Sequence, residues 1–266
     1  GKPYWTSLDS PGMGAPPDPD GFRTLAVTKD GTLRAGATDD GHLGVWDTRR
    51  GVVVARHPAL AAEAHFVAVF SGGPTVVWGN QESNYIWNVK ENTTRTLAAV
   101  IHGLPDVSPR GDRMASHEWT ASMVWDITVD PPRLVWRAEG WGPEYHSVFS
   151  PDGNWVATPS YNNDIRLQDS ETGALIGTLK GHTASVHSVD FSRDGRRVVS
   201  GGKDGTVCIW DTQHAQLLSS FAGRDGPISS VAISPDDNSF ASLADNGVLR
   251  LWTAANRQAA DQRVDR

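Results

Sequence analysis

Residues 181–211, GHTASVHSVDFSRDGRRVVSGGKDGTVCIWD, contain three short apolar-rich segments separated by the turns SRDG and KDG. The first segment, Val186–Phe191, has the alternation of apolar and polar side chains that is typical of a half-buried β-strand. The second and third apolar segments are residues 198–200 and 207–210. The turns between the three segments contain Asp and Gly, which favour turn conformations. Residues 217–221 add a fourth strand. A sheet this small cannot bury both of its faces alone, so we expect copies of it on either side.

The pattern recurs along the chain at intervals near 42 residues. The end of the third strand recurs, at spacings of 41, 38, 43, 42 and 42 residues, at Trp46, Trp87, Trp125, Gln168, Trp210 and Trp252. The first turn recurs, at spacings of 43, 37, 42, 42 and 42 residues, from Thr28, Ser71, Ser108, Ser150, Ser192 and Ser234. Two independent markers with one period predict an array of six repeats.

Gly181-His182, Ser200, Asp204 and Trp210-Asp211 resemble the signature of the WD-repeat (WD40) family. The resemblance extends over nearly the whole chain. It implies an all-β fold, a β-propeller of four-stranded antiparallel blades around a central channel. Six repeats are recognisable, and a seventh blade would need residues beyond this chain.

The same resemblance implies a structural tetrad, a hydrogen-bonded set formed by His182, Ser200, Asp204 and Trp210. Trp210 has a large apolar surface for the neighbouring blade and an indole N–H that needs an acceptor. We expect the tetrad to hold one blade together and to perform no chemistry. Only the fifth repeat carries the complete set, since the fourth has Gln168 in place of Trp and the sixth has Asn246 in place of Asp.

Three segments are predicted along the chain. Residues 1–21 form an N-terminal strand and a Gly/Pro-rich connection, residues 22–255 form the propeller, and residues 256–266 form a C-terminal strand or tail. Propellers commonly close by pairing an N-terminal outer strand with three C-terminal strands. We therefore expect the outer strand of the sixth blade to come either from the region of Trp5 or from residues 256–264. The chain begins with Gly rather than Met, so we expect a processed, tagged or partial protein.

Composition restricts the classes of partner. The formal net charge of -7 argues against nucleic acid, whose binding requires concentrated positive charge. No apolar run approaches the roughly 18 residues of a membrane helix. The single cysteine, Cys208, excludes an internal disulfide framework, so a reducing compartment is allowed and we expect a cytoplasmic protein.

No enzyme motif is present: the sequence lacks a P-loop, a His-Glu-x-x-His, paired cysteines and a Gly-x-Ser-x-Gly. We therefore expect a protein without catalytic residues, bound metal or cofactor. Propellers, as a family, bind partners through the loops on one rim, while the sheets hold those loops rigid.

Five residues on that rim are candidates for partner binding: Glu118, Trp119, Trp141, Glu144 and Tyr145. Trp119 and Trp141 lie outside the strand-end Trp positions, so packing between blades does not explain them. Aromatic side chains surrounded by acids are typical of a surface that takes a basic or aromatic peptide. Alternatively, both tryptophans fill gaps around the irregular third repeat.

Two functions remain. The first is a non-catalytic protein–protein interaction scaffold, either free or as the sensor or regulatory propeller of a larger multidomain protein. The second is an enzyme or small-ligand-binding propeller with a site in the central channel. Convergent polar side chains in the channel would favour the second function, and an aromatic and acidic rim patch would favour the first.

Overall fold

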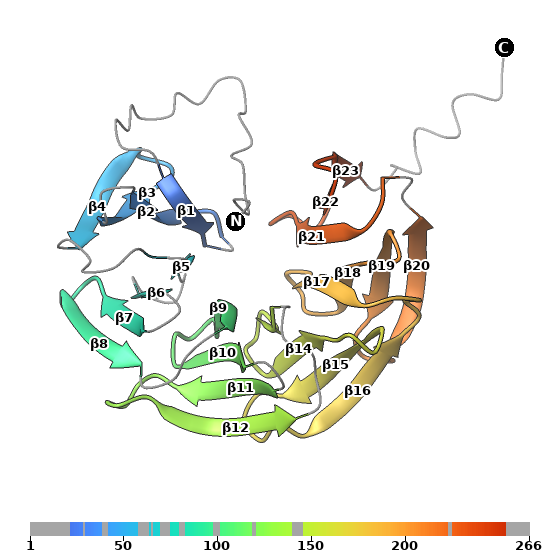
Figure 1. The fold of residues 1–266 in the computed structure, drawn as a ribbon, viewed down its shortest axis with the longest axis horizontal. Helices are drawn as coiled ribbons and strands as arrows, with labels where there is room; N and C mark the ends of the chain where they lie inside the picture. The colour runs from blue at the N-terminus through green and yellow to red at the C-terminus, as the bar shows by residue number, and fades with distance from the viewer. Residues whose placement is uncertain are drawn as a thin grey trace, which may run out of the picture. The chain divides into compact units, whose positions relative to one another are not determined.

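The computed structural model describes residues 22–28, 30–38, 42–57, 64, 66–69, 75–79, 83–97, 102–118, 121–139, 146–222 and 225–253; for residues 22–24, 38, 102–104 and 118 it describes the backbone. These residues form 23 β-strands in six antiparallel sheets, and no helix lies among them (Figure 1). The predicted all-β class is therefore confirmed. A helix long and apolar enough to cross a membrane is likewise not found in these ranges.

Every sheet pairs each strand with the next one in sequence. The first sheet contains β1 (Phe22–Val27), β2 (Leu33–Thr38), β3 (Leu43–Asp47) and β4 (Val52–His57). The second contains β5 (Phe66–Val69), β6 (Thr75–Gly79), β7 (Asn84–Asn88) and β8 (Thr93–Leu97). The third contains β9 (His102–Val107), β10 (Arg113–Glu118), β11 (Ala121–Asp126) and β12 (Arg133–Glu139).

The remaining sheets follow the same order. The fourth contains β13 (Val148–Phe149), β14 (Trp155–Pro159), β15 (Asp164–Asp169) and β16 (Leu175–Lys180). The fifth contains β17 (Val186–Phe191), β18 (Arg197–Gly202), β19 (Thr206–Asp211) and β20 (Gln216–Ala222). The sixth has three strands, β21 (Ile228–Ile233), β22 (Ser239–Ala244) and β23 (Leu249–Thr253). Residues 1–158 and 167–176 belong to one compact unit, and residues 159–166 and 177–266 belong to a second.

The repeated Ser-x-Asp-Gly turn is a closed set of local hydrogen bonds. Ser192 Oγ donates to Asp194 Oδ1 at 2.7 Å and accepts from the backbone N–H of Arg197 at 2.9 Å. Gly195 has a φ of 68°, which a residue without a Cβ adopts at little cost. Equivalent side-chain bonds from Ser to Asp occur at Ser150 and Ser234. The sequence marker is thus a turn that fixes its own geometry.

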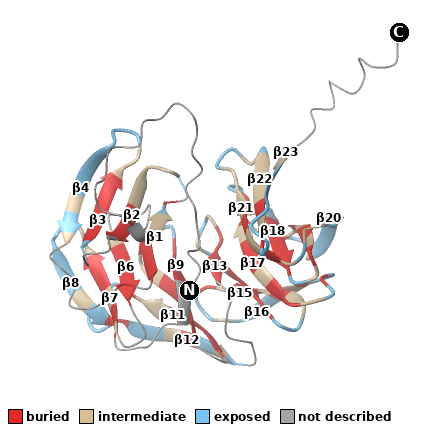
Figure 2. Ribbon diagram, turned by 45° about the horizontal axis from the view of Figure 1, so that its top comes forward, coloured by how far each residue is buried: buried red, intermediate tan, exposed pale blue. Residues whose placement is uncertain are grey.

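Neighbouring sheets within each unit bury their faces against each other. In the first unit, Leu43 and Val45 of the first sheet share a core with Val76 and Trp78 of the second. In the second unit, Val199 of β18 shares a core with Ile228 of β21. The outer strands are exposed instead, as β4, β8 and β20 show in Figure 2. Burial between sheets explains why each small sheet needs a copy beside it.

Two aspartates also connect the first strands of consecutive sheets. Asp106 Oδ2 in β9 accepts the backbone N–H of Phe149 in β13 at 2.7 Å. Asp190 Oδ2 in β17 accepts the backbone N–H of Ile233 in β21 at 2.8 Å. Both pairs are separated by 43 residues, which is about one repeat. These contacts were not predicted from the sequence.

The sixth sheet lacks a fourth strand among the described residues, so the outer edge of β23 has no strand partner there. Leu251 is 72% exposed and Leu249 is 50% exposed. The two segments predicted to supply this strand, residues 1–21 and 256–266, lie outside the described residues.

Candidate functional site

Four residues of the predicted binding patch, Trp119, Trp141, Glu144 and Tyr145, lie outside the described residues. The fifth, Glu118, is the last residue of β10, and its backbone is described. The described residues therefore define how the two segments that carry the patch, residues 119–120 and 140–145, are attached to the fold.

The described residues that precede both segments lie at one edge of the third sheet. Glu118 is the register partner of Ala121, and Ala121 is the register partner of Glu139. These three residues are therefore neighbours across the ends of β10, β11 and β12. In the sequence, residues 119–120 stand between β10 and β11, and residue 140 comes after β12.

Ser147, which follows the second segment in the sequence, is hydrogen-bonded to β10 of the same sheet. The backbone N–H of Ser147 donates to His117 Nε2 at 2.7 Å, and both residues are buried. The hydroxyls of Ser147 and Thr158 lie 2.9 Å apart and share a second hydrogen bond. Glu139 and Ser147, which come before and after this segment in the sequence, therefore lie next to β11 and β10, respectively.

His117 acts as a neutral hydrogen-bond acceptor. Burial, and to a lesser extent the nearby His146, lower the pKa of His117 to about 3. At neutral pH the ring is therefore uncharged, and the bond from the Ser147 N–H to Nε2 assigns the ring proton to Nδ1. An imidazole with this pKa is a structural group rather than a general acid or base at neutral pH.

The four residues of the expected tetrad form one hydrogen-bonded chain in the fifth sheet. Trp210 Nε1–H donates to Ser200 Oγ at 2.7 Å, and Ser200 Oγ lies 2.7 Å from His182 Nε2. His182 Nδ1 lies 2.9 Å from Asp204 Oδ2. Ser200 and Trp210 are fully buried, and His182 is 6% exposed.

Asp204 also connects two backbone segments, at Thr183 and Thr206, to the hydrogen-bonded tetrad. Its carboxylate accepts the backbone N–H of Thr183 at 2.8 Å, the backbone N–H of Thr206 at 3.0 Å and the Thr206 hydroxyl at 2.7 Å. Burial alone would raise the pKa of Asp204, but these hydrogen bonds and His182 hold it at about 2. The carboxylate is therefore ionised at neutral pH and is occupied by contacts within the fold.

Other sheets keep part of this arrangement. Trp252 Nε1 donates to Ser242 Oγ and Trp125 Nε1 donates to Ser116 Oγ, both at 2.9 Å. The bond at Trp125 was missed in the sequence, although a Ser nine or ten residues before the Trp is its signal. In the fourth sheet Gln168 donates to the Gly173 carbonyl instead, at 3.2 Å.

No metal centre was predicted, and the described ranges contain no group of three or more His, Cys, Asp or Glu residues that could hold an ion.

A family model described as WD domain, G-beta repeat, matches residues 173–211 and 215–253. The first match covers β16 to β19 and contains all four tetrad residues; the second covers β20 to β23. No curated protein is significantly similar to the chain in sequence.

Proposed function

We propose that this chain is a member of the WD-repeat family and a non-catalytic platform for protein–protein interactions, a proposal supported by the family-model matches over residues 173–211 and 215–253. In this proposal the six sheets are the blades of a β-propeller. The proposal is supported by the sequential strand order of every sheet and by the burial of neighbouring sheet faces within each unit. The single buried cysteine, Cys208, is a free thiol, which fits a cytoplasmic location.

The proposed binding site consists of Glu118, Trp119, Trp141, Glu144 and Tyr145. The observation that carries it is the register of Glu118, Ala121 and Glu139, from which both segments of the site start at one sheet edge. The Ser147–His117 hydrogen bond supports the same conclusion from the other end of the second segment. Short segments held at both ends on a rigid sheet are where proteins usually carry binding residues.

The proposed partner is a basic or aromatic peptide segment of another protein. Tryptophan and tyrosine supply most of the energy at typical interface centres, since they bury large areas with little loss of side-chain entropy. Glu118, Glu144 and the net charge of -7 would attract a basic partner and raise its association rate.

The test measures fluorescence anisotropy with two pools of short synthetic peptides, one rich in Lys, Arg and Trp and the other rich in Asp and Glu. We expect the basic pool to bind and Trp141→Ala or Trp119→Ala to weaken that binding about thirtyfold, which corresponds to about 2 kcal/mol. Val53→Ala, which removes an exposed apolar side chain from β4, is the control and leaves binding unchanged.

Equal binding of the two pools would contradict the proposed charge preference. Unchanged affinity in both tryptophan variants would remove the proposed site. If both variants instead lose the cooperative melting transition that Val53→Ala retains, the tryptophans pack gaps around the third sheet and do not form a partner site.

A further inference from the structure

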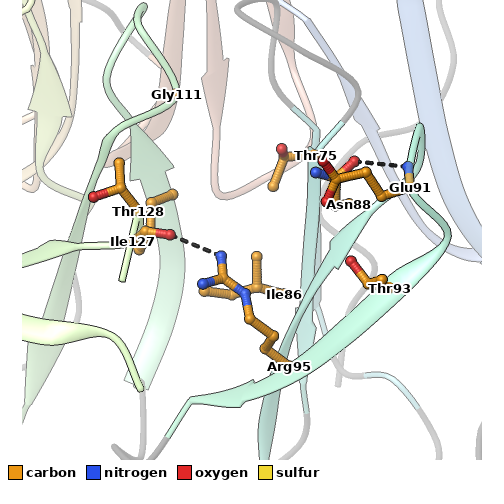
Figure 3. A pocket seen from close by; sticks show the side chains of 9 residues that line it. All are labelled: Thr75, Ile86, Asn88, Glu91, Thr93, Arg95, Gly111, Ile127 and Thr128. Atoms are coloured by element: carbon orange, nitrogen blue, oxygen red, sulfur yellow. Dashed lines mark hydrogen bonds between the residues drawn. The ribbon is translucent and has the colours of Figure 1, made fainter. Parts of the chain in front are cut away.

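A cleft of about 400 Å³ lies between the second and third sheets of the first unit (Figure 3). One wall is formed by Thr75 at the start of β6 and by Asn88, Glu91 and Thr93 around the β7–β8 turn. Thr128, which follows β11, contributes to the opposite wall. This volume lies within the range of small-molecule sites in proteins.

Arg95 of β8 crosses the cleft and provides a fixed positive charge. Its Nη1 donates to the Val129 carbonyl at 2.9 Å and its Nη2 donates to the Ile127 carbonyl at 2.7 Å (Figure 3 shows the second bond). No carboxylate of the described residues pairs with this guanidinium. Two of its five N–H groups are used by the carbonyls, so the others can still donate to an anion.

Glu91, in the β7–β8 turn on the same wall as Thr75, provides a negative charge. Its backbone N–H donates to Asn88 Oδ1 at 3.1 Å, which holds the turn in place. Among the described side chains and backbone groups, none pairs with the Glu91 carboxylate or with the hydroxyls of Thr75 and Thr93. The cleft thus presents a cation, an anion and two hydroxyls that are open to a ligand.

Two isoleucines line the cleft but leave little apolar surface open to it. Ile86 is 1% exposed and Ile127 is 3% exposed. Both belong to the core cluster that also contains Val77, Leu97 and Met114, so their apolar surface is already covered and the groups that a ligand can reach are mainly polar.

We infer that this cleft binds a small zwitterion, which is the chemistry of an amino acid or of a short peptide with free termini. The ligand carboxylate pairs with Arg95, and its ammonium group pairs with Glu91. A purely anionic ligand would face the Glu91 carboxylate, and a purely cationic one would face Arg95. Only a ligand with both charges satisfies both residues. The inference is independent of the proposed peptide patch.

The test is calorimetric titration of the whole chain with four probes: L-leucine, leucinamide, N-acetyl-L-leucine and the dipeptide Leu-Leu. Leucinamide lacks the carboxylate and N-acetyl-L-leucine lacks the ammonium group. We expect leucine or Leu-Leu to bind at least about tenfold more tightly than either blocked derivative, since each lost charge pair is partly desolvated. The charged groups are farther apart in Leu-Leu than in leucine, so the probe that binds more tightly shows which separation of charges fits the cleft.

Two variants assign the charges. Glu91→Gln should weaken the unblocked ligand and remove its preference over N-acetyl-L-leucine, whereas Arg95→Gln should remove the preference over leucinamide. Glu171→Gln, at an exposed turn position between β15 and β16, is the control and changes neither preference. Glu91 is exposed, so its variant folds even if Arg95→Gln does not. Absence of binding by all four probes, or a Glu91→Gln variant with unchanged preferences, overturns the inference.

Discussion

At the scale of single residues, buried side chains in this protein act as hydrogen-bond partners within the fold. Ser200 receives the Trp210 N–H and contacts His182, and Asp204 joins His182 to two backbone N–H groups. Each of these bonds contributes about 1 kcal/mol, but leaving one buried group unpaired costs more than the bond contributes. The loss of stability on mutation should therefore be largest for side chains that are buried and have several hydrogen-bond partners.

Asp204→Ala should destabilise the protein by roughly 1–3 kcal/mol, because it leaves the N–H groups of Thr183 and Thr206 and the His182 ring without their acceptor. Trp210→Ala should cost roughly 3–5 kcal/mol through lost burial and the cavity that remains. Urea unfolding measures both values. The control is Asn246→Ala in the sixth sheet, where Asn246 Oδ1 accepts one exposed N–H, from Val248. Equal losses for Asp204→Ala and Asn246→Ala would contradict this interpretation.

His117 should make stability depend on pH. Its pKa in the folded protein is about 3, below the ordinary value of 6.5. Between these values the unfolded chain binds a proton at His117 that the folded chain does not, so the contribution of His117 to stability falls as the pH is lowered from 6.5 toward 3. At pH 5 the loss is about 2 kcal/mol relative to neutral pH.

His117→Gln, which keeps a side-chain acceptor without this titration, should reduce that dependence by a similar amount. Urea unfolding at neutral pH and near pH 5 measures the free energy of unfolding of the unchanged protein and of His117→Gln. The contribution of Asp204, whose pKa is about 2, is lost only below its ordinary value of 3.8 and leaves this window undisturbed. Identical pH dependence in the two proteins would show that His117 is not the group responsible.

At the scale of elements, the spacing between neighbouring sheets is set by small residues and by specific polar contacts. Gly201 in β18 lies against Ile228 and Val231 in β21, and a Cβ at position 201 would overlap Ile228. Asp190, in the strand beside β18, accepts the backbone N–H of Ile233 in β21. The distance between the fifth and sixth sheets therefore depends on the contacts that β17 and β18 make with β21.

Gly201→Ala should cost roughly 1–3 kcal/mol, because the added methyl group forces Ile228 or its strand to move in a packed core. The matched control is Gly177→Ala in β16, where a Cβ would meet only Ala215 at 3.4 Å, an ordinary contact. Thermal unfolding compares the two variants. Equal melting temperatures would mean that the fifth and sixth sheets can separate at no cost.

At the scale of the whole molecule, the repeat is complete in five of the described sheets and incomplete in the sixth. The edge of β23 and the exposed side chains of Leu249 and Leu251 are a surface that a fourth strand would cover. The segment Lys2–Leu8 contains Tyr4, Trp5 and Leu8, whereas residues 256–264 are mostly polar. Of the two candidate segments, the N-terminal one has the apolar side chains that this surface requires.

Deletion of residues 1–8 should therefore lower stability by roughly 2 kcal/mol, which is about 4–8 °C in melting temperature for a domain of this size. Deletion of residues 256–266 should leave the melting temperature within about 1 °C. Thermal unfolding of both truncated chains is the measurement. The opposite result, a loss only on removal of the C-terminal segment, would assign the fourth strand to residues 256–264.

Local sequence patterns were sufficient to predict the all-β class, the repeat and most of its strands. These depend on local rules: alternation with a period of two marks strands such as Val186–Phe191, and Ser-x-Asp-Gly closes its own turn through bonds between residues two to five apart. The tetrad residues were also identifiable, because the complete motif occurs within 181–211.

Contacts between sheets were decided only by the tertiary structure. The bonds from Asp106 to Phe149 and from Arg95 to the carbonyls of Ile127 and Val129 join residues 32 to 43 positions apart. The bond from Ser147 to His117, beside the proposed binding site, joins residues 30 positions apart. No periodic pattern encodes such pairs, because they depend on how two separately formed sheets pack, and packing brings together side chains whose positions in sequence are unrelated to their distance in space.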